Sequence, residues 1–176
     1  MWWCKLAWSS LVLGLLFGLQ SCGFQPLYGS TGASGSDAVA HLAAMRISPI
    51  PDRSGQQLRN ALKDKLTPRG NVSAEIYKLD VSLEELRSDL VILQDATSTF
   101  AKVRIGAKFV LNDIKSGRPL TRGTSESTTI FNIVESEFAN LNAQSDARKR
   151  AVNQIGDDIR LKLGLFFRRH APRRGS

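Results

Sequence analysis

The sequence predicts an α+β fold, a two-layer sandwich in which a four-stranded sheet packs against helices in the order β-α-β-β-β-α. Residues 77–84 and 102–111 alternate apolar and polar side chains, as half-buried strands do. Residues 136–167 instead repeat apolar side chains every third or fourth position, as an amphipathic helix does. Strands with one apolar face and helices with one apolar stripe bury these surfaces against each other, which predicts a single domain over residues 41–167.

The first part of this domain is predicted to hold one strand and one helix. Residues 42–48 form a short strand that ends at two nearby prolines. The helix that follows begins at a capping box, Ser54 and Gln57, whose side chains each satisfy a free amide of the first turn. Leucines spaced four apart give this helix one apolar face, and the helix ends before Pro68.

Three strands and a long helix make up the rest. The strand over 77–84 either continues or bulges through 87–93, and the strand over 102–111 turns at 115–118 into a third strand. That third strand is rich in Ser and Thr on both faces, which suits an edge of the sheet. The final helix has Ser136 as its predicted N-cap.

The chain is predicted to carry a leader before the domain and a tail after it. Residues 1–21 hold a single Lys and an apolar run at 6–19, which is typical of a signal peptide and shorter than the roughly 20 residues of a membrane-spanning helix. A short uncleaved anchor is the alternative. Residues 22–40, which include a Gly/Ser-rich stretch, are predicted to be the lipidated N-terminus and a flexible linker. Residues 168–176 carry four Arg and are predicted to be a disordered basic tail.

Cys22 carries the most specific chemistry in the chain. It directly follows a small residue, Ser21, at the end of the apolar run, as the acylated cysteine of a bacterial lipoprotein does. Its thiol is the nucleophile that accepts a diacylglyceryl group, and cleavage then leaves an N-acylated, S-diacylglyceryl cysteine at the N-terminus. The next residue is Gly23 rather than Asp, which predicts sorting to the outer membrane. The only other cysteine, Cys4, lies in the leader, so the mature chain has no disulfide.

Composition and residue patterns narrow the function classes. The chain has 24 basic and 16 acidic residues, a net charge of +8, which attracts polyanions or simply aids solubility. An outer-membrane lipoprotein does not meet nucleic acid, so the predicted polyanion is lipopolysaccharide. The two histidines have no nucleophile, triad or metal-ligand pattern around them, and no phosphate-binding loop follows a strand. We therefore predict neither catalytic residues, nor a metal site, nor a cofactor beyond the acyl groups.

A group of basic residues is the candidate for binding. Lys102, Arg104 and Lys108 share the polar face of one predicted strand, and antiparallel pairing with the strand over 77–84 would place them near Asp80 and Glu84. The simpler interpretation is cross-strand charge pairing, which stabilises by a few tenths of a kcal/mol per pair. The functional interpretation is a basic ridge that binds phosphates through charge-assisted hydrogen bonds.

Several segments resemble a known family. The run Cys-Gly-Phe-Gln-Pro-Leu-Tyr, from Cys22 to Tyr28, resembles the mature start of the lipopolysaccharide-assembly lipoproteins, the LptE family, especially those of alphaproteobacteria. Shorter resemblances lie at Pro49–Gln56, Phe131–Ile133, Asp146–Arg148 and Asp158–Phe167. The resemblance implies a sheet with two helices on one face. It also implies a non-enzymatic lipoprotein that plugs the lumen of the outer-membrane β-barrel LptD, supports its assembly and assists insertion of lipopolysaccharide into the outer leaflet.

The resemblance does not place lipopolysaccharide at a hairpin tip, because residues 94–99 carry no basic side chain. The candidate lipopolysaccharide contacts are therefore Arg87, Lys102, Arg104 and Lys108. A lipoprotein that faces the periplasm alone and binds another envelope ligand, such as peptidoglycan, is the alternative function.

Overall fold

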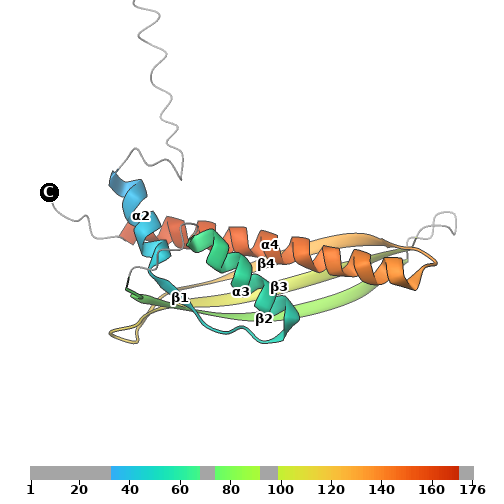
Figure 1. The fold of residues 1–176 in the computed structure, drawn as a ribbon, viewed down its shortest axis with the longest axis horizontal. Coiled ribbons are helices and arrows are strands. Elements are labelled where there is room, and N and C mark those ends of the chain that lie inside the picture. Colours follow the sequence, from blue (N-terminus) through green and yellow to red (C-terminus); the bar gives the residue numbers. More distant parts are fainter. Residues whose placement is uncertain (1–32, 68–73, 92–98, 171–176) are drawn as a thin grey trace, which may run out of the picture. The chain divides into compact units, whose positions relative to one another are not determined.

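A four-stranded mixed sheet carries helices on one face, in the order α-β-α-β-β-β-α (Figure 1). The computed structural model describes residues 33–67, 74–91 and 99–170, and for 33–37, 87–91 and 99 it describes the backbone alone. The strands lie in chain order: β1 (Met45–Ile47), β2 (Tyr77–Val91), β3 (Thr99–Asp113) and β4 (Pro119–Ile133). The helices are α2 (Ala33–Ala43), α3 (Asp52–Leu66) and α4 (Glu137–His170). The predicted α+β sandwich is confirmed, with one helix more than the sequence suggested.

The sheet is long in the direction of its strands. β2, β3 and β4 have 15 residues each and form antiparallel ladders, which at about 3.3 Å per residue extend for roughly 50 Å. The 34 residues of α4 rise about 51 Å, so the helix runs along nearly the whole length of β3 and β4. β1 has only three residues and pairs in parallel with the start of β2.

The hydrophobic core lies between the sheet and the helices. The predicted stripe of α4 is buried, and it meets alternate residues of β3 and the leucine face of α3, all of them less than 8% exposed. The buried residues of these three elements are Ala147, Ala151, Val152, Ile155, Ile159, Leu163 and Phe167 of α4, Ala101, Val103, Ile105, Ala107, Phe109 and Leu111 of β3, and Leu58, Leu62 and Leu66 of α3. None of the described helices covers the other face of the sheet, whose side chains can make other contacts (Figure 1).

Helix α2 corrects the predicted linker. The sequence suggested a flexible segment over 22–40, but the helix begins at Ala33 and buries Ala38 and Leu42 in the core. Gly and Ser disfavour a helix in isolation, and burial of one apolar face against α4 overrides that preference. Because α2 continues to Ala43, the strand predicted over 42–48 shortens to β1.

The predicted capping box of α3 does not form. The helix begins at Asp52, three residues earlier than a cap at Ser54 predicts, with Pro51 at the N-cap and no side-chain capping bond. Ser54 therefore lies inside the first turn, and its hydroxyl donates to a carboxylate oxygen of Glu85 at 3.1 Å instead. The end of the helix at Leu66, just before Pro68, agrees with the prediction.

The ends of α4 confirm one expectation and correct another. The hydroxyl of Ser136 accepts a hydrogen bond from the backbone N–H of Ala139 at 3.4 Å, as an N-cap does. The helix ends at His170, so Arg168 and Arg169 belong to its last turn rather than to the predicted tail. Basic residues in the last turn interact favourably with the partial negative charge at the end of a helix. Residues 171–176 lie outside the described part of the chain.

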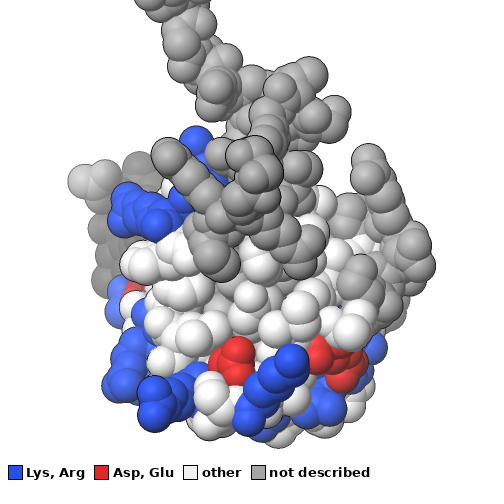
Figure 2. Space-filling model, turned by 90° about the vertical axis from the view of Figure 1, so that its left-hand side faces the viewer, with Lys and Arg blue, Asp and Glu red and all other residues white. Residues whose placement is uncertain are grey.

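The connection between β3 and β4 is the hairpin that the sequence predicted. Asp113 accepts hydrogen bonds from the backbone N–H and the hydroxyl of Ser116, at 2.7 and 3.0 Å, and Gly117 adopts a φ of 67° that favours glycine. β4 is an edge strand as expected, and β2 continues through residues 87–91. We call the end of the sheet with the turn at 113–118 the hairpin end. Figure 2 views this end, where Lys and Arg outnumber Asp and Glu on the surface.

Candidate functional site

Three of the four predicted contact residues lie together on the open face of the sheet. Lys102, Arg104 and Lys108 alternate with buried residues of β3, so all three point away from the helices. The backbone of Arg87 is paired with that of Val103 in the ladder between β2 and β3. The side chain of Arg87 lies outside the described part of the chain.

The cations of β3 do not make the charge pairs that the sequence predicted. The guanidinium of Arg104 lies 3.1 Å from a carboxylate oxygen of Glu126 on β4, and both side chains are about half exposed. Among the described residues, neither Lys102 nor Lys108 forms an ion pair. Glu84 lies opposite Gly106 rather than opposite a cation. Two of the three cations are therefore available to a ligand.

A shallow groove crosses the middle of this face at Gly106. Glu84 and Glu126 flank the glycine on the neighbouring strands, and a Cβ at Gly106 would meet no heavy atom closer than 3.9 Å. The groove has a volume of about 420 Å³. It is lined by residues 82–84, 106–108 and 124–126. Lys108 lies at one end of it and Arg104 follows on the other side of the glycine, so two cations and two carboxylates border the groove.

Aliphatic side chains accompany the cations. Leu86 of β2 is 63% exposed and lies opposite Arg104, and Ile130 of β4 is 55% exposed and lies opposite Lys102. Neither residue was singled out from the sequence, because a single apolar residue within a polar pattern gives no signal of its own. Cations and exposed aliphatic groups side by side suit a ligand with both anionic and apolar parts.

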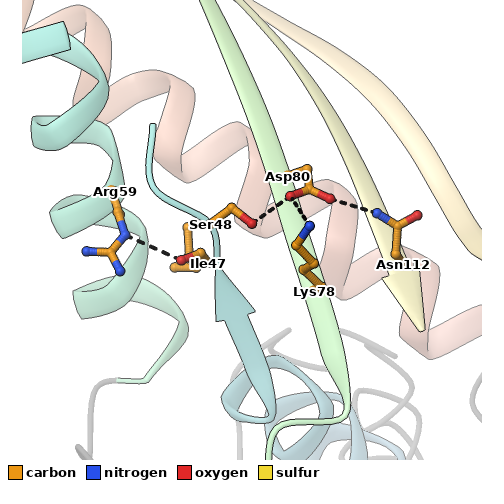
Figure 3. Close-up of polar contacts among 6 residues, drawn as sticks. All are labelled: Ile47, Ser48, Arg59, Lys78, Asp80 and Asn112. Carbon is orange, nitrogen blue, oxygen red and sulfur yellow. Dashed lines mark hydrogen bonds and ion pairs between the residues drawn. The ribbon is translucent and has the colours of Figure 1, made fainter. Parts of the chain in front are cut away.

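A separate polar cluster fastens β1 to the sheet at the hairpin end (Figure 3). Asp80 accepts hydrogen bonds from the hydroxyl of Ser48 at 2.6 Å and from the side-chain amide of Asn112 at 2.9 Å, and the ammonium of Lys78 lies 3.0 Å away. Burial alone would raise the pKa of the Asp80 carboxyl, but these donors outweigh it and hold the pKa below its ordinary value. The predicted pairing of Asp80 with the cations of β3 is wrong, because closer donors satisfy it.

This cluster holds β1 in place at the edge of the sheet. Three strands meet at Asp80, and β1 is too short to be held by its own ladder. Arg59 of α3 supports β1 from the other side, since its Nε donates to the carbonyl of Ile47 at 3.3 Å (Figure 3). Together these contacts fix the edge of the sheet next to α3.

The two histidines take part in aromatic packing. The ring of His41 on α2 stacks on Phe167 of α4 at 5.1 Å, and its Nδ1 lies 3.0 Å from the hydroxyl of Tyr77. His170 stacks on Phe166 at 4.7 Å. Within residues 33–67, 74–91 and 99–170, no three potential metal ligands come together, and no helix has the length and apolar character needed to cross a bilayer. Cys22 lies outside the described residues.

The fold and this surface define a class of protein, a small α+β domain with helices on one face of its sheet and a basic, partly aliphatic face on the other. A putative lipoprotein from Caulobacter crescentus has a similar structure, with a TM-score of 0.62 and 23% identity over 77% of this chain and 97% of that one. A minor lipoprotein from Acinetobacter baumannii matches with a TM-score of 0.52 and 14% identity, over 69% of this chain and 90% of that one. The rare lipoprotein B from Shewanella oneidensis matches with a TM-score of 0.50 and 12% identity, over 69% of this chain and 93% of that one. At these identities the likeness establishes the fold.

The sequence profile of a family described as LptE, lipopolysaccharide-assembly, matches residues 42–163, which is more than half of the chain. The chain belongs to the LptE family. A search of curated proteins finds no match to the sequence.

Proposed function

We propose that this protein is a non-enzymatic lipoprotein that plugs and supports the assembly of the lipopolysaccharide-assembly β-barrel, LptD, and assists insertion of lipopolysaccharide into the outer leaflet. Removal of a signal peptide over 1–21 makes Cys22 the N-terminal residue. Acyl chains on Cys22 then hold the protein at the outer membrane, on the periplasmic side. It needs no metal or cofactor beyond those acyl groups. Membership of the LptE family over residues 42–163 supports the role in lipopolysaccharide assembly.

The observation that carries the lipopolysaccharide contact is the composition of the open face of the sheet. Lys102, Arg104 and Lys108 offer cations to phosphate groups, and Leu86 and Ile130 offer aliphatic surface beside them. A lipopolysaccharide molecule has both chemistries, since its phosphorylated head group lies next to its acyl chains. Charge-assisted hydrogen bonds to phosphate contribute about 1.5–3 kcal/mol each, and the aliphatic contacts add to them.

One feature of the edge strand β4 favours a domain that lies inside the barrel over one that adds a strand to the barrel wall. The ammonium of Lys162 on α4 donates to the backbone carbonyl of Thr124 at 2.6 Å and also binds Asp158 at 2.7 Å. A lysine on a backbone carbonyl of an edge strand obstructs the addition of another strand there. Lys162 therefore blocks the edge of β4 at Thr124, and this agrees with a domain that lies inside a barrel without joining its sheet.

Co-purification from detergent extracts tests the partner. The tagged full-length protein is expected to bring with it one large β-barrel protein in a stoichiometric complex, and the mass of the mature N-terminus is expected to correspond to triacylated Cys22. A preparation that contains the lipoprotein without any barrel would refute the proposal. Retention on purified peptidoglycan in such a preparation would favour the alternative of a stand-alone envelope binder.

Replacement of two cations tests the contact surface. Lys102→Ser with Arg104→Ser is expected to weaken binding of purified lipopolysaccharide at low salt at least tenfold, given roughly 1.5–3 kcal/mol for each charge-assisted contact. The exposed Arg104–Glu126 pair contributes less than about 1 kcal/mol, so the fold should persist. Lys149→Ser with Arg150→Ser, two exposed cations of α4, is the matched control and should bind almost as the wild type does. Equal losses in both double variants would assign the binding to net charge alone.

A further inference from the structure

The hairpin end carries a second set of cations, separate from those of the open face. It is contributed by β1, α3, the turn at 113–118 and the last turn of α4. Its exposed members are Arg46, Lys63, Lys115, Arg118, Arg168 and Arg169. Figure 2 shows Lys and Arg spread over this end of the domain. Elements far apart in the sequence thus bring positive charge to one surface.

Two carboxylates near this surface, Glu75 and Asp113, are engaged locally and offset only part of its positive charge. Glu75 lies 3.5 Å from Arg46. Asp113 holds the turn through Ser116, whose backbone N–H and hydroxyl keep the pKa of that carboxyl below its ordinary value. Among the described residues, the cations of the turn and of the last turn of α4 form no ion pair. The hairpin end therefore retains an excess of positive charge at neutral pH.

The chain also enters the domain at this end. Helix α2 packs against the last turns of α4, where His41 stacks on Phe167, and it leads directly into β1 (Figure 1). Ten residues lie between Cys22 and Ala33, and the eleven peptide links that join the two span at most about 40 Å even when fully extended. The strands run roughly 50 Å from the hairpin end to the other end of the sheet. An acyl anchor on Cys22 therefore keeps the hairpin end close to the membrane.

We propose that the hairpin end rests on the surface of an anionic phospholipid bilayer, in the leaflet that holds the acyl chains. This proposal rests on the lipid anchor of the proposed function, and it adds which end of the domain faces the membrane. Basic side chains within about 10 Å of an anionic surface are attracted to it, and a lipid anchor combined with a basic patch binds more stably than the anchor alone. Lys102 and Arg104 lie toward the other end of β3 and stay free for lipopolysaccharide.

Flotation with phospholipid vesicles tests the orientation without barrel or lipopolysaccharide. The mature chain from residue 22 with Cys22→Ser, which removes acylation, is mixed with phosphatidylcholine vesicles that contain about one-third phosphatidylglycerol. It is expected to float with them at low salt, to be released as salt is raised, and not to float with pure phosphatidylcholine. Each basic side chain at an anionic surface contributes about fivefold to binding, so Arg168→Gln with Arg169→Gln is expected to weaken it about 25-fold.

The control lies on the same helix. Lys149→Gln with Arg150→Gln removes the same charge from the exposed face of α4 far from the hairpin end and is expected to change vesicle binding less than about twofold. Circular dichroism checks that all variants remain folded. Equal losses in the two double variants, or equal binding to neutral and anionic vesicles, would overturn the proposal.

The outcomes separate this proposal from the function it extends. If the protein does not bind anionic vesicles but co-purifies with a β-barrel, the proposed function stands and the proposed orientation is wrong. If the protein binds vesicles through Arg168 and Arg169 but co-purifies with no β-barrel, the membrane-binding surface stands and the proposed role as a barrel partner is wrong. Binding to lipopolysaccharide micelles with no binding to phosphatidylglycerol vesicles would assign the hairpin end to lipopolysaccharide and overturn the phospholipid proposal.

Discussion

The same substitution, glycine to alanine, should have opposite effects at two helical positions of this fold. Gly55 of α3 lies against the segment that leads from β1 into the helix. A Cβ there would be 2.7 Å from Cγ2 of Ile50 and 3.0 Å from its carbonyl carbon and oxygen. Gly164 of α4 is also buried, but a Cβ there would have no neighbour within 4 Å. The two sites therefore share helix geometry and burial and differ in the space available.

The distances determine the sign of each effect. Alanine is favoured over glycine inside a helix by about 1 kcal/mol, so Gly164→Ala should stabilise the protein by about that amount. At Gly55 the contacts include the main chain of Ile50 as well as its side chain, and Ile50 is itself buried, so rotation of that side chain alone cannot relieve them. Overpacking of this kind costs about 1–3 kcal/mol and should outweigh the gain in propensity. We expect a gap of roughly 2 kcal/mol between the two variants.

Equilibrium unfolding in urea measures this gap. With a dependence of about 1–3 kcal/mol per molar urea for a small domain, the midpoints should differ by about 1 M, with wild type between them. Gly156→Ala is an intermediate case, because its closest neighbour is the flexible side chain of Lys65, whose Cε lies 3.4 Å away. Stabilisation by Gly55→Ala equal to that by Gly164→Ala would show that α3 does not approach Ile50 as closely as described.

Two further predictions concern the core and the cluster at Asp80. Leu62→Ala, at a fully buried position of α3, is expected to cost about 2–5 kcal/mol, whereas Leu161→Ala on the exposed side of α4 should cost far less, as urea midpoints will report. Asp80 has a lowered pKa in the folded state, so its carboxylate stabilises the fold fully above the unfolded pKa and loses this effect as pH falls through the folded value. The urea midpoints of wild type and Asp80→Asn should therefore differ at neutral pH and converge in acid; a difference that is constant with pH would contradict the role of the charge.

Much of the fold could be predicted because its periodic patterns are long. The alternation over 102–111 and the apolar stripe over 136–167 each extend through enough residues to specify type, face and approximate bounds. The hairpin at 115–118 and the polar edge strand were predicted for the same reason, because turn chemistry and the lack of a strongly apolar face are local properties. Helix α2 was missed because its composition is that of a linker, and only its contact with α4 gives it an apolar face to bury.

The candidate site was predicted only in part. The alternation of β3 was sufficient to place Lys102, Arg104 and Lys108 on one face. Their neighbours depend on the register between strands, which the sequence does not specify to one residue, so the partner of Arg104 is Glu126 rather than Asp80 or Glu84. The same register places Leu86 and Ile130 beside the cations. The sequence of a single strand cannot predict this arrangement, because it joins residues of three strands.

The sequence by itself determined the order of the main elements, the two-layer architecture and the family to which the chain belongs. These follow from local periodicity and from short motifs, which are properties of neighbouring residues. Only the tertiary structure decided where the charge lies. It gathered cations from β1, α3, the 113–118 turn and α4 at the hairpin end and left a different set on the open face, because residues far apart along the chain acquire a common surface only when the sheet and helices pack.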